Sequence, residues 1–223
     1  MTGALDAPEI RLRREWGTEL AARVWRLRDP MLAISSAPLG GGLGLRQWVL
    51  NVQVPHAYDG AEPASYLAAL AAEAGALGLG VGMMTAVDVR VASTVQREGI
   101  SVDATVGVIG ATQWAAAPEP SPLLSGGTDA RVPGTINIVV AFPERLSDAA
   151  LVNAVGTATE AKAQALWDAG IEGTGTATDA LCVLCPPGGD AHAYGGPRSQ
   201  WGGRLARVVY RAVRAGCQSV EPS

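Results

Sequence analysis

Residues 81–108, VGMMTAVDVRVASTVQREGISVDATVGV, decide the fold class, because apolar and polar side chains alternate along them. Strict alternation is typical of a strand with one buried face, so a long strand is predicted from Val81 to Val95. The odd-numbered positions carry the apolar residues Val81, Met83, Val87, Val89, Val91 and Val95. The even-numbered positions carry the polar residues Asp88, Arg90, Thr94 and Gln96. The turn 97–99 and the alternating apolar residues from Ile100 to Val108 predict a returning antiparallel strand. We therefore expect a hairpin at the centre of a sheet.

The segments on either side of this hairpin predict more strands and three helices. Short candidate strands occupy residues 9–36, and a glycine-rich turn at 38–44 leads into another strand. Strong helix formers follow from Pro63 to about residue 76. Further elements are a strand over 135–142, a helix from the N-cap Ser147 to Gly170, a strand over 177–186 and a helix from about residue 199.

This order of elements favours an α+β fold, because strands and helices do not alternate strictly. We expect a single domain over residues 1–223, with a mixed, largely antiparallel sheet covered by helices. Residues 1–30 are treated as an extension whose contribution is open. The segment 115–134 is rich in proline, glycine and small polar residues, and it is expected to be a long surface loop.

The charge balance argues against a nucleic-acid partner. The net charge is -4 and the isoelectric point is about 5.2, whereas phosphate binding would require a basic surface. No apolar run is long enough to span a bilayer and the N-terminus carries no apolar leader, so a cytoplasmic protein without a membrane partner is expected. A homo-oligomer remains open.

Motifs for several common chemistries are absent from the sequence. There is no phosphate loop, no GxGxxG, no GxSxG and no HExxH. Cys182 and Cys185 are expected on opposite faces of one strand, which disfavours a metal or redox pair. His56 and His192 have no partner at a ligand spacing, so no metal site is expected.

A hydrolase of this composition would use a carboxylate as its base, and the candidates are Asp88, Asp103, Glu160 and Asp179. Asp179 follows the turn TGTAT at a strand entrance, where it could be either an Asx-type cap or a catalytic group. Asp88 stands beside Arg90, which leaves an exposed ion pair as its simpler interpretation.

Lys162 is the only lysine in the chain, and a helical projection puts it with Thr159 on the face that meets the sheet. Glu160 points outward in the same projection. An unpaired ammonium group is costly in such a place, so Lys162 must find a partner. Two interpretations remain open: a structural ion pair with an aspartate, or a site lysine that polarises a carbonyl.

Eight blocks of sequence resemble the adenosylcobinamide amidohydrolase family in their order and separation. They are SSAPLGGGLG (35–44), NVQVP (51–55), VGMMTAVDV (81–89), ATVGV (104–108), PGTINIVV (133–140), NAVGTATEAKAQAL (153–166), TGTATDALCVLCP (174–186) and YGGPRSQWGGRLARVV (194–209). The resemblance covers nearly the whole chain from about residue 30. It implies cleavage of the amide between a corrin propionyl side chain and aminopropanol, which releases adenosylcobyric acid for cobalamin synthesis.

The expected substrate is adenosylcobinamide, which brings its own cobalt, so no further cofactor or metal is expected. Asp179 is the expected base, Lys162 or Asn137 the donor to the amide oxygen, and Thr176 or Thr178 the group that orients water. The residues expected to bind substrate are Gly41, Gly42, Asn51, Asp88, Asn137 and Trp114. Two alternatives stay open: a noncatalytic corrinoid-binding protein, and an amidohydrolase with a threonine nucleophile.

Overall fold

The computed structural model describes residues 5–15, 17–55, 58, 61–108, 111–116 and 134–218. Its strands are β1 (Glu9–Glu15), β2 (Thr18–Ser35), β3 (Gly42–Gln53), β4 (Gly80–Thr85), β5 (Ser93–Arg97), β6 (Ile100–Val106), β7 (Ile136–Ala141) and β8 (Ala180–Cys185). Its helices are α1 (Pro63–Glu73), the single 3₁₀ turn η1 (Val89–Val91), α2 (Asp148–Asp168) and α3 (Gln200–Gln218).

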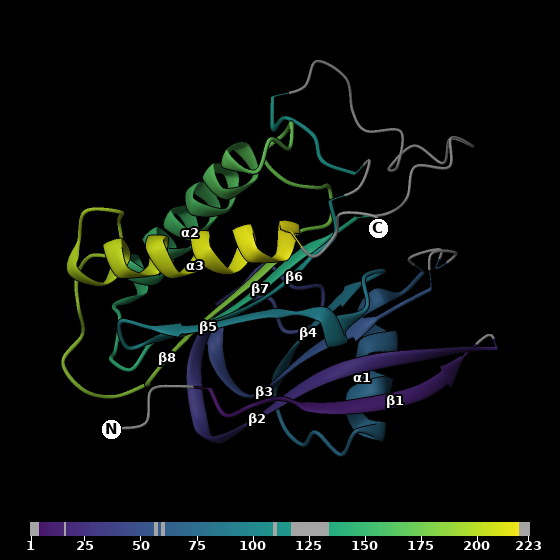
Figure 1. Cartoon of the computed structure of the whole chain (residues 1–223). Helices are drawn as coiled ribbons and strands as arrows, with labels where there is room; N and C mark the ends of the chain where they lie inside the picture. The colour runs from purple at the N-terminus through teal and green to yellow at the C-terminus, as the bar shows by residue number, and fades with distance from the viewer. Residues whose placement is uncertain are drawn as a thin grey trace.

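The described strands form one eight-stranded sheet in the order β4-β3-β2-β8-β7-β6-β5, with β1 paired to β2 (Figure 1). The pairs β3–β4 and β7–β8 are parallel, and every other pair in this order is antiparallel. The predicted α+β class with a mixed, largely antiparallel sheet is therefore confirmed.

The long strand β2 lets this sheet fold over on itself. Its pairing with β3 shifts register between Arg26 and Met31, and only the part after this shift pairs with β8. Asn51 of β3 hydrogen-bonds Thr105 of β6 at 3.1 Å, although three strands separate β3 from β6 in the sheet order. Side chains of strands so far apart can touch only if the two halves of the sheet face each other.

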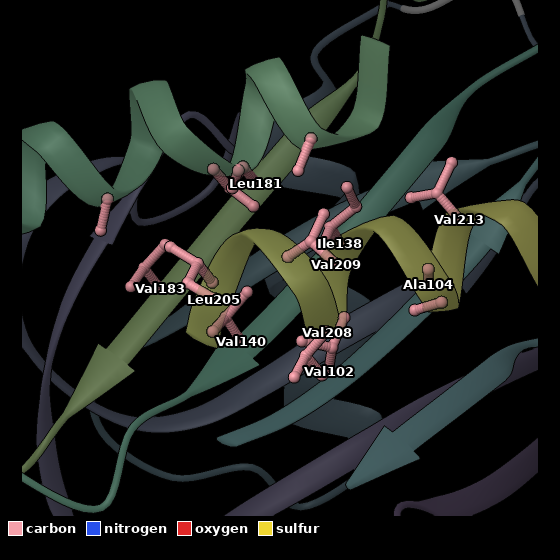
Figure 2. Packing of buried hydrophobic residues seen from close by; sticks show 14 of the residues in the cluster. Val102, Ala104, Ile138, Val140, Leu181, Val183, Leu205, Val208, Val209 and Val213 are labelled. Carbon is pink, nitrogen blue, oxygen red and sulfur yellow. The ribbon is translucent and has the colours of Figure 1, made fainter. Parts of the chain in front are cut away.

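Helices cover both outer faces of the folded sheet. α2 and α3 pack on β6, β7 and β8 on one side, and α1 packs on β2 and β3 on the other (Figure 1). Figure 2 shows the first of these layers, in which branched side chains of α3 meet those of the three strands. The labelled residues are Val102, Ala104, Ile138, Val140, Leu181, Val183, Leu205, Val208, Val209 and Val213.

The long strand predicted over 81–95 is wrong, because it is two strands with the 3₁₀ turn η1 between them. β4 pairs with β3 at one end of the sheet order, whereas β5 pairs with β6 at the other. The side chain of Asp88 caps η1 by accepting from the backbone N–H of Arg90 at 2.9 Å. The β5–β6 hairpin is confirmed, but it lies at an edge of the sheet and not at its centre.

Two further expectations need correction. The short candidate strands expected over residues 9–36 are instead β1 and the single 18-residue strand β2. On α2 the N-cap Ser147 is confirmed, but Thr159, which the projection put on the face that meets the sheet, is exposed, and the buried threonine is Thr157. The buried face of α2 consists mostly of alanines, which give a projection little contrast between its faces.

Candidate active site

The carboxylate of Asp179, in the turn before β8, accepts from four hydrogen-bond donors of this turn, β7 and α2. Its Oδ1 accepts from the backbone N–H of Ile136 at 2.8 Å and from the hydroxyl of Thr176 at 2.6 Å. Its Oδ2 accepts from the backbone N–H of Thr176 at 3.1 Å and from the ammonium group of Lys162. Asp179 thus caps its own turn and also ties that turn to β7 and α2.

Lys162 forms an ion pair with Asp179, which supplies the partner that its position on α2 requires. The side chains of Lys162 and Asp179 are 11% and 14% exposed, so the ion pair is mostly withdrawn from water. Gly175 makes room for this contact, because a Cβ there would lie 2.3 Å from Asp179 Oδ2 and 2.4 Å from Lys162 Nζ. A side chain at position 175 would therefore force the ion pair apart.

Two threonine hydroxyls lie at the rim of this cluster. Thr176 is partly buried, and its hydroxyl points at Asp179. Thr178 is exposed, and its Oγ1 lies 2.6 Å from Oγ1 of Thr135 and donates to the carbonyl of Gly134 at 3.3 Å. The four residues predicted to be catalytic therefore come together at the edge of the sheet where β7 and β8 begin.

The glycine-rich turn between β2 and β3 starts from the same edge. Ser36 and Leu181 exchange hydrogen bonds of 3.0 and 3.1 Å, and Leu181 is only two residues beyond Asp179. A Cβ on Gly41 would lie 2.6 Å from a carbonyl oxygen of its own turn, and Gly42 has a φ of 83°. Close packing accounts for Gly41 and the positive φ accounts for Gly42, and substrate binding by either glycine stays a prediction.

Asn51 and Asn137 meet between the two halves of the sheet, where each is 1% exposed. Asn137 Nδ2 donates to Oδ1 of Asn51 at 2.8 Å and to the carbonyl of Met84 at 3.0 Å. Both N–H donors of Asn137 are thus engaged within the protein, and its own Oδ1 is buried without a partner among the described residues. Donation to a substrate would require this network to open, so a role for either asparagine stays a prediction.

The other carboxylates that the sequence suggested lie in different surroundings. Asp88 bonds the side chain of Arg90, and these hydrogen bonds lower the pKa of Asp88 from its ordinary value. Asp103 is 4% exposed beside Arg23, and burial raises the pKa of Asp103 despite the guanidinium group. Glu160 is exposed, as predicted. None of these three has a described contact with the Lys162–Asp179 pair, and substrate binding by Asp88 stays a prediction.

The neighbours of Trp114 in sequence connect it to the cluster through backbone hydrogen bonds. Gln113 N–H donates to the carbonyl of Gly175 at 2.8 Å, and Ala115 N–H donates to the hydroxyl of Thr174 at 3.1 Å. The indole of Trp114 is 46% exposed and is therefore open to a ligand. Of the predicted loop 115–134, residues 117–133 lie outside the described part of the chain, as does His56.

The cysteines do not form a reactive centre. Cys182 packs between the halves of the sheet and Cys185 packs under the helices, which confirms that their sulfurs diverge. Burial raises the pKa of Cys182 to about 12 and also raises the pKa of Cys185. Within the described ranges, no three His, Cys, Asp or Glu residues are grouped so that they could hold a metal ion.

A cavity lies away from the cluster. A cavity of about 280 Å³ opens beside the register shift of β2 and is lined by residues such as Arg28, Asp29 and Pro186. Pro186 comes just after the last residue of β8, whereas Asp179 comes just before its first residue. The cavity and Asp179 therefore lie at opposite ends of β8 and do not form one site. Among the helices that the structure describes, none is long and apolar enough to cross a membrane.

Comparison with known proteins gives these features a context. A family model described as adenosylcobinamide amidohydrolase matches residues 7–222. The chain belongs to the adenosylcobinamide amidohydrolase family. The match confirms the resemblance seen in the sequence blocks, and it extends into the first 30 residues, which form β1 and most of β2.

Two curated relatives carry the same family name. The adenosylcobinamide amidohydrolase of Methanosarcina mazei is 28% identical over 209 residues, which are 87% of this chain and 97% of the relative. That of Halobacterium salinarum is 44% identical over 88 residues, 39% of this chain and 37% of the relative. The chain is accordingly an enzyme of the hydrolase class that acts on an amide.

In this amidohydrolase, sequence reasoning missed three residues of the candidate site. Thr135 contacts Thr178, Gly175 makes room for the ion pair, and the indole of Trp167 lies tilted against that of Trp114 with 5.9 Å between ring centroids. The alternating glycines of GTGT could have indicated a close approach of backbone to side chains. The sequence held no signal for the two tertiary contacts.

Proposed function

We propose that the chain hydrolyses the amide that joins aminopropanol to a propionyl side chain of the corrin ring in adenosylcobinamide. Water adds to the amide carbon, the C–N bond breaks, and adenosylcobyric acid and aminopropanol leave. The product returns a scavenged corrinoid to cobalamin synthesis. The chain supplies no cofactor in this proposal, since the cobalt arrives as part of the substrate.

One observation carries the proposal: the linked arrangement of Thr176, Asp179 and Lys162 at an accessible edge of the sheet. A hydroxyl within 2.6 Å of a carboxylate, which is itself held by a third group, is the usual arrangement of an activated nucleophile. The ammonium group of Lys162 has three N–H donors, and its described contact with Asp179 uses one. A remaining donor can bind the oxygen that becomes negative during attack on the amide.

In the first route, Asp179 acts as a general base on water. A water that binds at Thr176 and Thr178 gives a proton to the Thr176 hydroxyl as that hydroxyl passes its own proton to Oδ1 of Asp179, and the water oxygen attacks the amide carbon. The proton then passes from Asp179 to the departing nitrogen of aminopropanol. The bond from Ile136 N–H to the same Oδ1 keeps that oxygen oriented.

The 2.6 Å contact also favours a second route, in which Thr176 is the nucleophile. Its Oγ1 attacks the amide carbon while the hydroxyl proton moves to Asp179. The C–N bond then breaks, that proton passes to the nitrogen of the departing aminopropanol, and an ester joins Thr176 to the corrinoid acyl group. Water then cleaves that ester. Denaturing the enzyme during turnover and weighing it by mass spectrometry separates the routes, because only the second adds the acyl mass to the chain.

The test is to incubate purified protein with adenosylcobinamide and to measure adenosylcobyric acid and aminopropanol by mass spectrometry. Thr176→Val removes the hydroxyl and keeps the side-chain volume, so turnover should fall by about 10²-fold or more. Loss of the hydroxyl's hydrogen bond to Asp179 should lower the free energy of unfolding by roughly 1.5–3 kcal/mol, which leaves the chain folded. Thr159→Val is the matched control, because Thr159 bonds only the carbonyl of Val155 on the exposed side of α2 among the described contacts.

The possible results separate clearly. Products from the wild type and the Thr159 variant, but not from the Thr176 variant, support the proposal. Products in equal amount from the Thr176 variant would remove this cluster from the reaction. A wild type that binds adenosylcobinamide tightly and leaves the amide intact would contradict hydrolysis of this substrate.

A further inference from the structure

A pair of exposed tryptophans, Trp114 and Trp167, stands beside the candidate site. Their indoles are 46% and 65% exposed, their ring centroids lie 5.9 Å apart, and their planes meet at 59°. Single exposed apolar residues are common, but two adjoining indoles open to water form a patch that suits an aromatic partner.

The pair is joined to the Lys162–Asp179 cluster from two sides. Trp114 belongs to the segment 111–116, which pairs with the turn that contains Gly175, and a Cβ on Gly175 would collide with both charged groups. Trp167 lies on α2 five residues after Lys162, which is roughly 7.5 Å along the helix axis and about 140° around it, and its indole reaches back to Trp114. In Figure 1 this end of α2 lies beside the teal segment that precedes the undescribed residues. A substrate seated at the cluster therefore has the indoles within reach.

We infer that the two indoles bind the adenine of the adenosyl group that the corrinoid carries on cobalt. This inference rests on the proposed function for its substrate. A purine is flat and aromatic, and an indole stacks on it without requiring a particular hydrogen-bond pattern. Two rings that meet at 59° offer the base one ring face and the edge of the second ring. The pair then selects adenosylated corrinoids over those with a small upper ligand.

The test compares adenosylcobinamide with methylcobinamide, which keeps the corrin ring and the scissile amide but lacks the purine. Binding is measured by equilibrium dialysis and turnover by kcat/KM, for the wild type, Trp114→Leu and Trp167→Leu. Leucine keeps the site apolar and removes the ring face. Each variant should lose roughly 5- to 150-fold in affinity for adenosylcobinamide and little for methylcobinamide. Tyr194→Leu is the control, because Tyr194 is a 74% exposed aromatic residue.

The outcomes distinguish this inference from the proposed function. Binding that prefers the adenosyl form and depends on both indoles supports it even if no amide is cleaved. Cleavage of both corrinoids with equal efficiency, or equal losses for both in the variants, overturns it while hydrolysis stands. A change in oligomeric state of Trp167→Leu, seen by light scattering without a change in preference, would assign the pair to an interface between copies and also overturn it.

Discussion

Replacing Gly175 by alanine should disable the candidate site through a displacement that the structure specifies. The new Cβ would lie 2.3 Å from Asp179 Oδ2 and 2.4 Å from Lys162 Nζ, whereas ordinary contact begins at 3.4 Å. The charged groups must therefore move by about 1 Å. A displacement of that size at reacting groups can cost about 10²-fold in rate. Loss of the charge-assisted hydrogen bond should lower the free energy of unfolding by roughly 1.5–3 kcal/mol.

The assay pairs Gly175→Ala with Gly156→Ala. Gly156 is an exposed residue of α2, and a Cβ there meets nothing within 4 Å. That control should gain about 0.5–1 kcal/mol, because alanine is the better helix former, and it should turn over like the wild type. Urea unfolding gives the stabilities, and release of aminopropanol gives the rates. Unchanged stability and rate for Gly175→Ala would refute the claim that the ion pair needs a glycine beside it.

Two further predictions concern groups away from the site. Asp103→Leu should lower the free energy of unfolding by about 3–5 kcal/mol, because it leaves Arg23 charged and buried, while adding Arg23→Met should restore much of that loss. Urea unfolding of both variants checks this, and a double variant less stable than the single one would contradict it. Burial raises the pKa of each of the three free cysteines, so iodoacetamide near pH 8 should label none in the native protein and all three after unfolding in guanidinium. Rapid labelling of a still folded chain would show that a thiol is accessible.

Local features of the fold could be predicted because their causes are local. Ser147 begins α2 by accepting the N–H of Ala150, and Gly170 follows its end with a φ of 74°. The β5–β6 hairpin follows from its alternation and its Gly99 turn. Alternation alone did not reveal the break between β4 and β5, because valines continue at odd-numbered positions through η1. The structure separates these valines, since Val89 is buried and Val91 is 56% exposed.

The folding of the sheet onto itself could not be predicted, because it depends on contacts between distant residues. Arg23 bonds Asp103 across 80 positions of sequence, and Asn51 bonds Asn137 across 86. For the site, the need of Lys162 for a partner could be predicted from burial cost alone. The choice of Asp179 among four carboxylates depends on how α2 crosses the start of β8, and no sequence pattern encodes that.

The two interpretations of Asp179, a turn cap and a catalytic base, are compatible, and this decides how its variants must be interpreted. Asn in place of Asp179 keeps Oδ1, but it puts an amide NH₂ where Oδ2 now accepts from Lys162 and from the N–H of Thr176. Donors would then face donors, so this variant should lose stability even if the carboxylate takes no part in catalysis. Loss of turnover in Asp179→Asn is therefore ambiguous by itself. Thr176→Val leaves both Oδ2 contacts and the Ile136 bond in place, so a loss of turnover without a matching loss of stability would point to chemistry at the hydroxyl.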